Sequence, residues 1–229
     1  IKILKDNIEK YFNKKIMTLS LDDYYLSHNE RLRLSKKIHH LFKTRGVPGT
    51  HNIVKLTKDI NDFEKARYPI NIPIFDKFKD DKSSKIRKEK NKKDILLLEG
   101  WCCGCPPLEE KYLNRNINKL ESLEDKDRIW RNYFNMNLHN EYKKLFKIFD
   151  KIIFLKTPSF KYVLKWRLKQ EKMNISDNKN QIKMNKKDTL YFISHYEKIT
   201  KWMIKKLPHI ANLVVYINER QEVTKKKIN

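Results

Sequence analysis

The stretch Ile95-Leu96-Leu97-Leu98-Glu99-Gly100 decides the fold that this sequence favours. Four consecutive apolar residues that end in an acid and a glycine are typical of a central parallel strand, buried on both faces. A second apolar run, residues 16–21, predicts another buried strand, and it leads into Asp22 and Asp23. Open α/β sheets bind their ligands at the carboxyl ends of such strands. We therefore expect the acids that follow the two strands to share one edge of a sheet.

Segments with helical spacing alternate with extended segments along the whole chain. Helices are expected at 1–12, 29–44, 56–65, 129–149, 160–172 and 188–207, and further strands at 70–75, 151–155 and 213–217. This alternation predicts an α/β fold with a mostly parallel, doubly wound sheet. A length of 229 residues predicts a single domain over residues 1–229. Two charged stretches, at about 79–94 and 174–187, are predicted to be surface loops.

The charge of the chain is strongly positive, with 52 Lys and Arg residues against 28 Asp and Glu residues. Such an excess favours an anionic partner, either nucleic acid, an acidic lipid surface or a phosphorylated small molecule. The lysines are spread over Asn-rich and Ile-rich stretches of the whole chain, which favours a solvated surface over a dedicated nucleic-acid patch. Nucleic acid is thus a partner that the charge permits but does not favour.

Two absences bear on the compartment in which the protein works. No run of roughly 18 apolar residues occurs, so no transmembrane helix is predicted. All three cysteines lie in residues 101–105, a spacing that indicates small, buried, reduced thiols and not a disulfide framework or a zinc site. We therefore expect a cytoplasmic protein.

Acids at two strand ends and a basic helix supply three of the groups that phosphoryl transfer requires. Asp22 would accept the proton of an attacking hydroxyl group, and Glu99 would hold Mg²⁺ directly or through water. Arg167, with Lys165 beside it, would bind phosphate oxygens. Each residue also has a purely structural interpretation. The Asp22-Asp23 pair could cap a helix or form an Asx turn, and the basic helix could be a solvated face.

The fourth group, a phosphate cradle, is missing from the sequence. No Gly-x-x-x-x-Gly-Lys-[Ser/Thr] motif occurs among the glycines at 46, 49, 100 and 104. The first residues already have the spacing of a helix, so we expect the cradle and the first strand to precede Ile1. The chain as written should then bind ATP poorly and turn over little.

Several segments, taken in their order and spacing, carry a resemblance to a known family. They are residues 20–26, 45–51, 75–77, 98–101 with Gly104, Pro107 and Leu108, and then 135–142, 166–171 and 191–196. Together they resemble the D-glycerate 3-kinase family of P-loop kinases, which is related to uridine kinase, phosphoribulokinase and pantothenate kinase.

The resemblance implies a three-layer P-loop kinase fold that uses ATP and Mg²⁺ to phosphorylate a small metabolite, D-glycerate first of all. It places Asp22 at the acceptor hydroxyl, Glu99 on the magnesium side, and Arg167 with Lys165 in a lid. The acceptor side would be formed by Asp23, Tyr25, Arg45, His51, Asp76 and Lys77. A cationic Arg45 or Lys77 would suit an acceptor that bears a carboxylate.

Departures from the family pattern leave the acceptor open. Asn52 stands where the family usually has an acid, and the stretch after Lys77 is shorter than usual. Two other functions therefore stay open at this point. One is a nucleoside kinase like uridine kinase, and the other is a catalytically inactive protein that binds a nucleotide or RNA on the same scaffold.

Overall fold

The computed structural model describes residues 1–177 and 185–229. The chain divides into two compact units, Ile1–Cys103 and Gly104–Asn229. The single domain expected over residues 1–229 stays a prediction. Of the predicted loop at 174–187, residues 178–184 lie outside the described residues.

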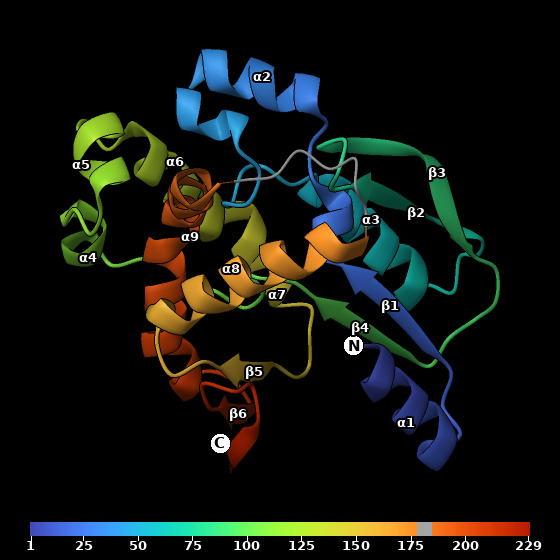
Figure 1. Ribbon diagram of the computed structural model, residues 1–229. Coiled ribbons are helices and arrows are strands. Elements are labelled where there is room, and N and C mark those ends of the chain that lie inside the picture. Colours follow the sequence, from blue (N-terminus) through green and yellow to red (C-terminus); the bar gives the residue numbers. More distant parts are fainter. Residues whose placement is uncertain (178–184) are drawn as a thin grey trace. The chain divides into compact units, whose positions relative to one another are not determined.

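The first unit contains two small sheets and the helices that flank them (Figure 1). Its elements are α1 (Lys2–Phe12), β1 (Ile16–Ser20), the 3-10 helix η1 (Leu21–Tyr24), α2 (His28–Lys37), the 3-10 helix η2 (His40–Lys43), α3 (Ile53–Glu64), β2 (Ile70–Asp76), β3 (Asp81–Glu89) and β4 (Ile95–Glu99). The helix expected at 29–44 is in fact α2 followed by η2, with a break after Lys37.

The two apolar runs form the predicted pair of parallel strands. β1 and β4 pair in parallel from Ile16 opposite Ile95 to Ser20 opposite Glu99. The side chains of Ile16 and Met17 are fully buried, as expected for a strand in the core. The α/β class and the parallel pairing of the core strands are thus confirmed.

The segment predicted as a loop at 79–94 is mostly a strand. β3 takes up Asp81–Glu89 and pairs in antiparallel fashion with β2, with Asp76 opposite Asp81 at the turn. The loop prediction was wrong because backbone hydrogen bonds to β2 hold this strand, and these need no apolar side chains. A Lys-rich edge strand also discourages pairing with other chains.

The second unit combines six α-helices and two short helices of other types with a three-stranded sheet in its described residues. Its elements are α4 (Glu110–Asn114), α5 (Lys119–Glu124), α6 (Ile129–Asn137), the π-helix η3 (Leu138–Tyr142), α7 (Lys143–Phe146), β5 (Ile153–Lys156), α8 (Phe160–Asp177), α9 (Lys186–Lys206), the 3-10 helix η4 (Leu207–His209), β6 (Leu213–Ile217) and β7 (Val223–Ile228). β5 and β6 are parallel, and β7 adds an antiparallel strand that the sequence pattern did not predict.

The predicted loop at 174–187 was wrong at both of its described ends. α8 continues to Asp177, and α9 already begins at Lys186. The start of α9 has a clear local cause, because the Asn185 side chain accepts a hydrogen bond from the Asp188 amide at 2.9 Å and so caps the helix.

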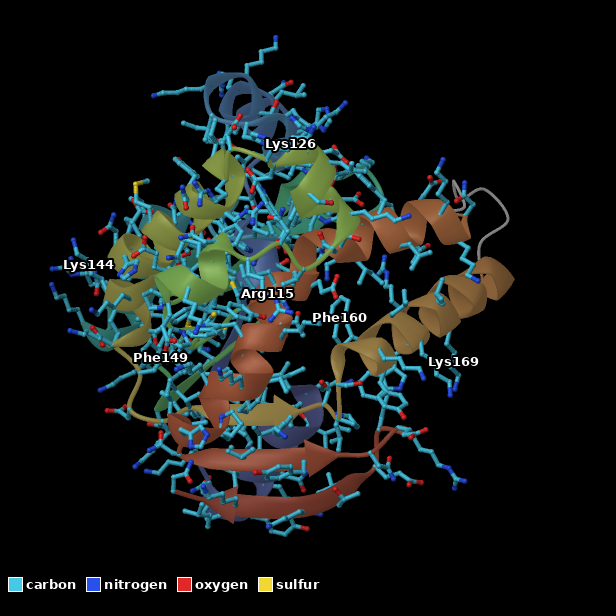
Figure 2. The ribbon with its side chains drawn as sticks, turned by 90° about the vertical axis from the view of Figure 1, so that its left-hand side faces the viewer. Arg115, Lys126, Lys144, Phe149, Phe160 and Lys169 are labelled. Atoms are coloured by element: carbon cyan, nitrogen blue, oxygen red, sulfur yellow. The ribbon has the colours of Figure 1, made fainter. Side chains whose placement is uncertain are left out.

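The surface of the second unit is rich in cations. Lys126 lies in the turn between α5 and α6, Lys144 on α7 and Lys169 on α8, and all three are exposed side chains (Figure 2). Within residues 1–177 and 185–229, no helix has the length and hydrophobicity needed to cross a membrane.

Candidate active site

The carboxylates of Asp22 and Glu99 follow the ends of two adjacent parallel strands. Glu99 is the last residue of β4 and lies opposite Ser20, the last residue of β1. A Cβ atom at Gly100 would lie only 2.6 Å from the Cβ atom of Leu21, so the close approach of the two chains after the strands requires glycine at this position. Both acids therefore lie at the same edge of the β1–β4 sheet, as the sequence predicted.

The negative charges of Asp22 and Glu99 both affect the pKa of the Cys103 thiol. Burial raises its pKa well above the usual value, and the negative charges of Glu99 and Asp22 act in the same direction. A thiol with a raised pKa is a poor nucleophile at neutral pH, so this cysteine is not a candidate for covalent chemistry. None of the three cysteines forms a disulfide bond, and Cys102 and Cys105 are buried as expected, whereas Cys103 is half-buried.

Asp22 forms an ion pair with Lys77, which lies 55 residues further along the chain. The Lys77 ammonium nitrogen lies 2.6 Å from Oδ2 of Asp22, and both side chains are at least partly exposed. Among the described residues, the Asp22 carboxylate accepts no backbone N–H group, so it caps no helix. The interpretation of Asp22 as a local cap is therefore wrong, and its carboxylate faces a cation that comes from a distant segment.

Asp23 has a different environment from its neighbour. Its Oδ1 atom accepts the backbone N–H of Phe75 at 3.2 Å, which ties η1 to β2. Burial raises the pKa of Asp23, although the Phe75 amide and the positive charges of Arg87 and Lys77 oppose that rise. The two adjacent acids thus differ in solvation, which is a common way to separate the roles of neighbouring carboxyl groups.

The loop at 45–51 is held against the segment that follows η1. The rings of Tyr25 and His51 stack with their centroids 4.3 Å apart, and the Asn52 amide donates to the Tyr24 carbonyl oxygen at 2.7 Å. Burial lowers the pKa of His51 to about 3, while the nearby charge of Asp22 acts to raise it. His51 is therefore a neutral side chain at physiological pH, placed close to Asp22.

Other residues expected on the acceptor side have structural partners. Arg45 and the buried Arg31 both pair with Asp80, which lies in the turn between β2 and β3. Oδ1 of Asp76 accepts the amides of Phe78 and Lys79 at 2.9 and 3.1 Å, so it shapes the same turn. The structure thus brings Arg45 and Asp76 to the hairpin beside Lys77, and their roles in substrate binding stay predictions.

Arg87 is a cation near the site that sequence reasoning missed. It lies on β3, donates to the carbonyl oxygen of Thr18 on β1, and acts electrostatically on Asp23 and Tyr24. No local signal marks it, because it stands among many basic residues in a stretch expected to be a loop. Only the pairing of β3 with β2 carries its side chain to β1.

No group of three or more His, Cys, Asp or Glu residues that could hold a metal ion occurs in the described part of the chain. This result is compatible with Mg²⁺, which usually takes one or two carboxylates together with substrate phosphates and several waters. The exposed carboxylate of Glu99 at a strand end fits such a site.

Arg167 and Lys165 lie on α8 in the second unit. The Arg167 guanidinium lies 5.6 Å from the ring centroid of Phe192, and Lys165 is exposed. The half-buried position of Arg167 excludes the interpretation of this residue as part of a fully solvated face. The assignment of both residues to a lid stays a prediction.

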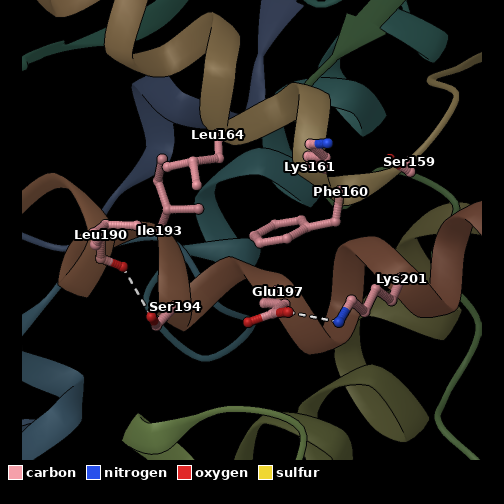
Figure 3. A pocket seen from close by; sticks show the side chains of 9 residues that line it. All are labelled: Ser159, Phe160, Lys161, Leu164, Leu190, Ile193, Ser194, Glu197 and Lys201. Atoms are coloured by element: carbon pink, nitrogen blue, oxygen red, sulfur yellow. Dashed lines mark hydrogen bonds and ion pairs between the residues drawn. The ribbon is translucent and has the colours of Figure 1, made fainter.

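A cavity of about 490 Å³ lies between α8 and α9 in the second unit (Figure 3). Phe160, Leu164 and Ile193 give it a largely apolar lining. Glu197 and Lys201 also line it and form an ion pair, with 2.6 Å between Oε1 and Nζ. The acids at the ends of β1 and β4 do not line this cavity. Its lining suits an apolar group better than a triphosphate.

Comparisons with known proteins show that the chain is similar to several proteins named as kinases. It is 28% identical over 203 residues to the uncharacterized kinase mug58 of Schizosaccharomyces pombe, covering 80% of this chain and 68% of that protein. It is 31% identical over 195 residues to the probable ATP-dependent kinase TDA10 of Saccharomyces cerevisiae, covering 77% and 63%. The chloroplastic D-glycerate 3-kinase of Arabidopsis thaliana is 26% identical over 202 residues, covering 83% and 41%. The chain thus spans about two thirds or less of the length of these relatives.

A solved structure agrees with these sequence relationships. The D-glycerate 3-kinase from Cryptococcus neoformans superposes with a TM-score of 0.80 and 23% identity, covering 100% of this chain and 84% of that structure. No family model matches the sequence. In sequence and in fold, the chain is a relative of D-glycerate 3-kinases and of fungal proteins named as kinases, which confirms the resemblance found in its motifs.

Proposed function

We propose that this protein transfers the γ-phosphoryl group of ATP to a hydroxyl group of a small metabolite, with D-glycerate as the first candidate. The observation that carries the proposal is the placement of Asp22 and Glu99 after the ends of adjacent parallel strands. The kinase relatives support the type of reaction.

In the proposed reaction, Asp22 is the general base. Its carboxylate takes the proton of the acceptor hydroxyl while that oxygen forms a bond to the γ-phosphorus of ATP. The bond between the γ-phosphorus and the β–γ bridging oxygen breaks, and ADP leaves with the electron pair. A general base of this kind contributes about 10²–10⁴ in rate.

Glu99 would hold the Mg²⁺ ion that accompanies ATP, directly or through water. When bound, that ion neutralises charge on the phosphate oxygens. Arg167 and Lys165 would add cations in a lid. The neutral, buried His51 and its stacking partner Tyr25 would form one wall of the acceptor site, with Asp23 behind it.

The choice of a carboxylate-bearing acceptor is supported by the charges near Asp22. Lys77 presents an exposed ammonium group at this position. A second cation, Arg45, belongs to the adjacent loop, although it pairs with Asp80. A hydroxy acid such as D-glycerate offers both a hydroxyl group for Asp22 and a carboxylate for these cations. A nucleoside offers no such anion.

The proposal is tested by ADP release from the purified full-length gene product, with ATP and Mg²⁺ and with D-glycerate or uridine as acceptor. We expect stimulation by D-glycerate, loss of turnover when EDTA removes Mg²⁺, and a fall in kcat of about 10²–10⁴ in Asp22→Asn. Stimulation by uridine alone would favour the nucleoside kinase instead.

A matched control separates the loss of a base from the loss of a surface charge. Asp6 is an exposed acid on α1 of the same unit, and Asp6→Asn should keep wild-type kcat. An Asp22→Asn variant as active as Asp6→Asn would reject Asp22 as the base. Absence of stimulation by every acceptor would favour the inactive nucleotide-binding or RNA-binding protein.

A further inference from the structure

The ion pair between Lys77 and Asp22 occupies the group that the proposed reaction needs as a base. The ammonium nitrogen lies 2.6 Å from Oδ2 of Asp22, which is the distance of a strong, charge-assisted hydrogen bond. A carboxylate oxygen that accepts such a bond has less capacity to accept the proton of a substrate hydroxyl. In this arrangement Asp22 is restrained by its own neighbour.

The backbone at Lys77 is held by the surrounding turn, whereas its side chain is largely exposed to solvent. Lys77 lies in the turn between β2 and β3, and Asp80 in the same turn is paired with Arg31 and Arg45. The side chain of Arg31 is 1% exposed, but that of Lys77 is 58% exposed. Rotation of the Lys77 side chain therefore needs no movement of the hairpin.

The energy that holds Lys77 on Asp22 is small. Ion pairs between solvent-accessible side chains contribute little to stability, because water solvates both charges and the side chains lose entropy. A carboxylate on an arriving acceptor offers Lys77 a second partner of the same charge. The Asp22 carboxylate and the acceptor carboxylate therefore compete for the ammonium group on nearly equal terms, and binding of the acceptor can shift the ammonium group from Asp22 to the acceptor.

We infer that Lys77 is a positioning residue that restrains Asp22 until the carboxylate of the acceptor draws its ammonium group away. This inference rests on the proposed function and adds a basis for acceptor selectivity. An acceptor with a carboxylate releases the base when it binds, whereas water or a plain alcohol does not. The contact with a group remote from the reacting hydroxyl thus raises kcat as well as affinity.

The test compares D-glycerate with glycerol, which has a hydroxymethyl group in place of the carboxylate, in wild type, Lys77→Met and Lys77→Arg. In wild type we expect kcat with D-glycerate to exceed kcat with glycerol by up to about fivefold, because the release of a weak ion pair can change the rate by no more than the free energy of that pair. In Lys77→Met the kcat ratio should approach one, and ATP hydrolysis without acceptor should rise relative to turnover of D-glycerate. Lys77→Arg keeps the positive charge and should retain most of the ratio.

Lys79 provides a matched control in the same turn. It is exposed, and its ammonium group forms no ion pair among the described residues. Lys79→Met should therefore behave as wild type, and urea denaturation of both Met variants should show unchanged stability. A Lys77→Met variant with a raised KM for D-glycerate but an unchanged kcat ratio would overturn the inference, because Lys77 would then only bind substrate. Absence of wild-type turnover with any acceptor would instead reject the proposed function, and the inference with it.

Discussion

The imidazole of His51 is 5% exposed and stacks on the ring of Tyr25 with a centroid distance of 4.3 Å. Burial disfavours the charged imidazolium and lowers the pKa of His51 to about 3, compared with about 6.5 in an unfolded chain. The neutral form is therefore the one that fits the folded site. Charging of this residue must cost stability.

We expect the folded first unit to lose stability as the pH falls below about 6.5. In that range the unfolded state takes up a proton at His51, but the folded state does not until about pH 3. The contribution of His51 to stability is thus fully present above pH 6.5 and decreases by about 1.4 kcal/mol per pH unit below it. Between pH 7.5 and 5.0 the loss should be about 2 kcal/mol.

Urea denaturation at these two pH values measures the effect in wild type and in His51→Gln. The variant should lack this part of the pH dependence. His209→Gln serves as the control, since that histidine is exposed on η4 in the second unit, and it should keep the wild-type dependence. Equal pH dependence in His51→Gln and wild type would contradict the assignment.

At the scale of elements, a buried network of charges connects α5, α6 and α9 in the second unit. The Arg131 side chain is 0% exposed, and its Nε atom donates to Oδ2 of Asp125 at 2.7 Å. Lys198 on α9 lies 3.2 Å from Glu121 on α5, and both are buried. Burial raises the pKa of Glu121 and lowers that of Lys198. The opposite charges compensate one another only while all partners are present.

Arg131→Met should destabilise the protein by about 3–5 kcal/mol, because it leaves Asp125 and Glu121 without their shared cation in a buried place. Arg131→Lys should restore only part of this loss, since an ammonium group cannot reproduce the several hydrogen bonds of the guanidinium. Urea denaturation followed by tryptophan fluorescence provides the measurement, because the buried Trp130 is next to Arg131.

Lys126→Met is the matched control for this network. Lys126 is exposed and lies just before α6, so its replacement should change the free energy of unfolding by less than about 0.5 kcal/mol. A loss below about 1 kcal/mol in Arg131→Met would show that the network contributes little to the stability of the unit.

For the whole molecule, the most prominent property is its net charge of +24. Exposed lysines such as Lys126, Lys144 and Lys169 lie on different segments of the second unit, which is the distribution of a solvated surface (Figure 2). Such a surface attracts polyanions through counterion release, without a dedicated site. The proposed kinase activity needs no nucleic acid.

We therefore expect a single-stranded RNA oligonucleotide to bind weakly and to lose about 10³-fold or more in affinity between 50 and 200 mM salt. Fluorescence anisotropy with a labelled oligonucleotide measures this dependence. ADP release at 150 mM salt should be unaffected by the same RNA. RNA binding that persists at 200 mM salt, or that competes with ATP, would instead favour the RNA-binding alternative.

Local sequence patterns were sufficient for the strands of the core and for the acids that follow them. The mostly apolar stretches at 16–20 and 95–99 correspond to β1 and β4, and the stretch at 213–217 corresponds to β6. Such runs can be interpreted because strands that pack into a core favour apolar side chains at successive positions. The expectation that residues 95–98 are buried on both faces was wrong, since these residues of β4 are only half-buried in a two-stranded sheet. The positions of Asp22 and Glu99 at strand ends follow directly from where these runs stop.

The partners of these acids depended on folding. Lys77 reaches Asp22 across 55 residues of sequence, and Arg87 approaches β1 only because β3 pairs with β2. A sequence pattern reports which side chains a segment tends to bury, but it does not report which segments meet. The exposed, Lys-rich strand β3 is held by backbone hydrogen bonds, so its sequence has no apolar pattern from which a strand could be predicted. The positions of the acids at the strand ends were therefore predictable from the sequence, whereas the cations beside them were placed by long-range contacts.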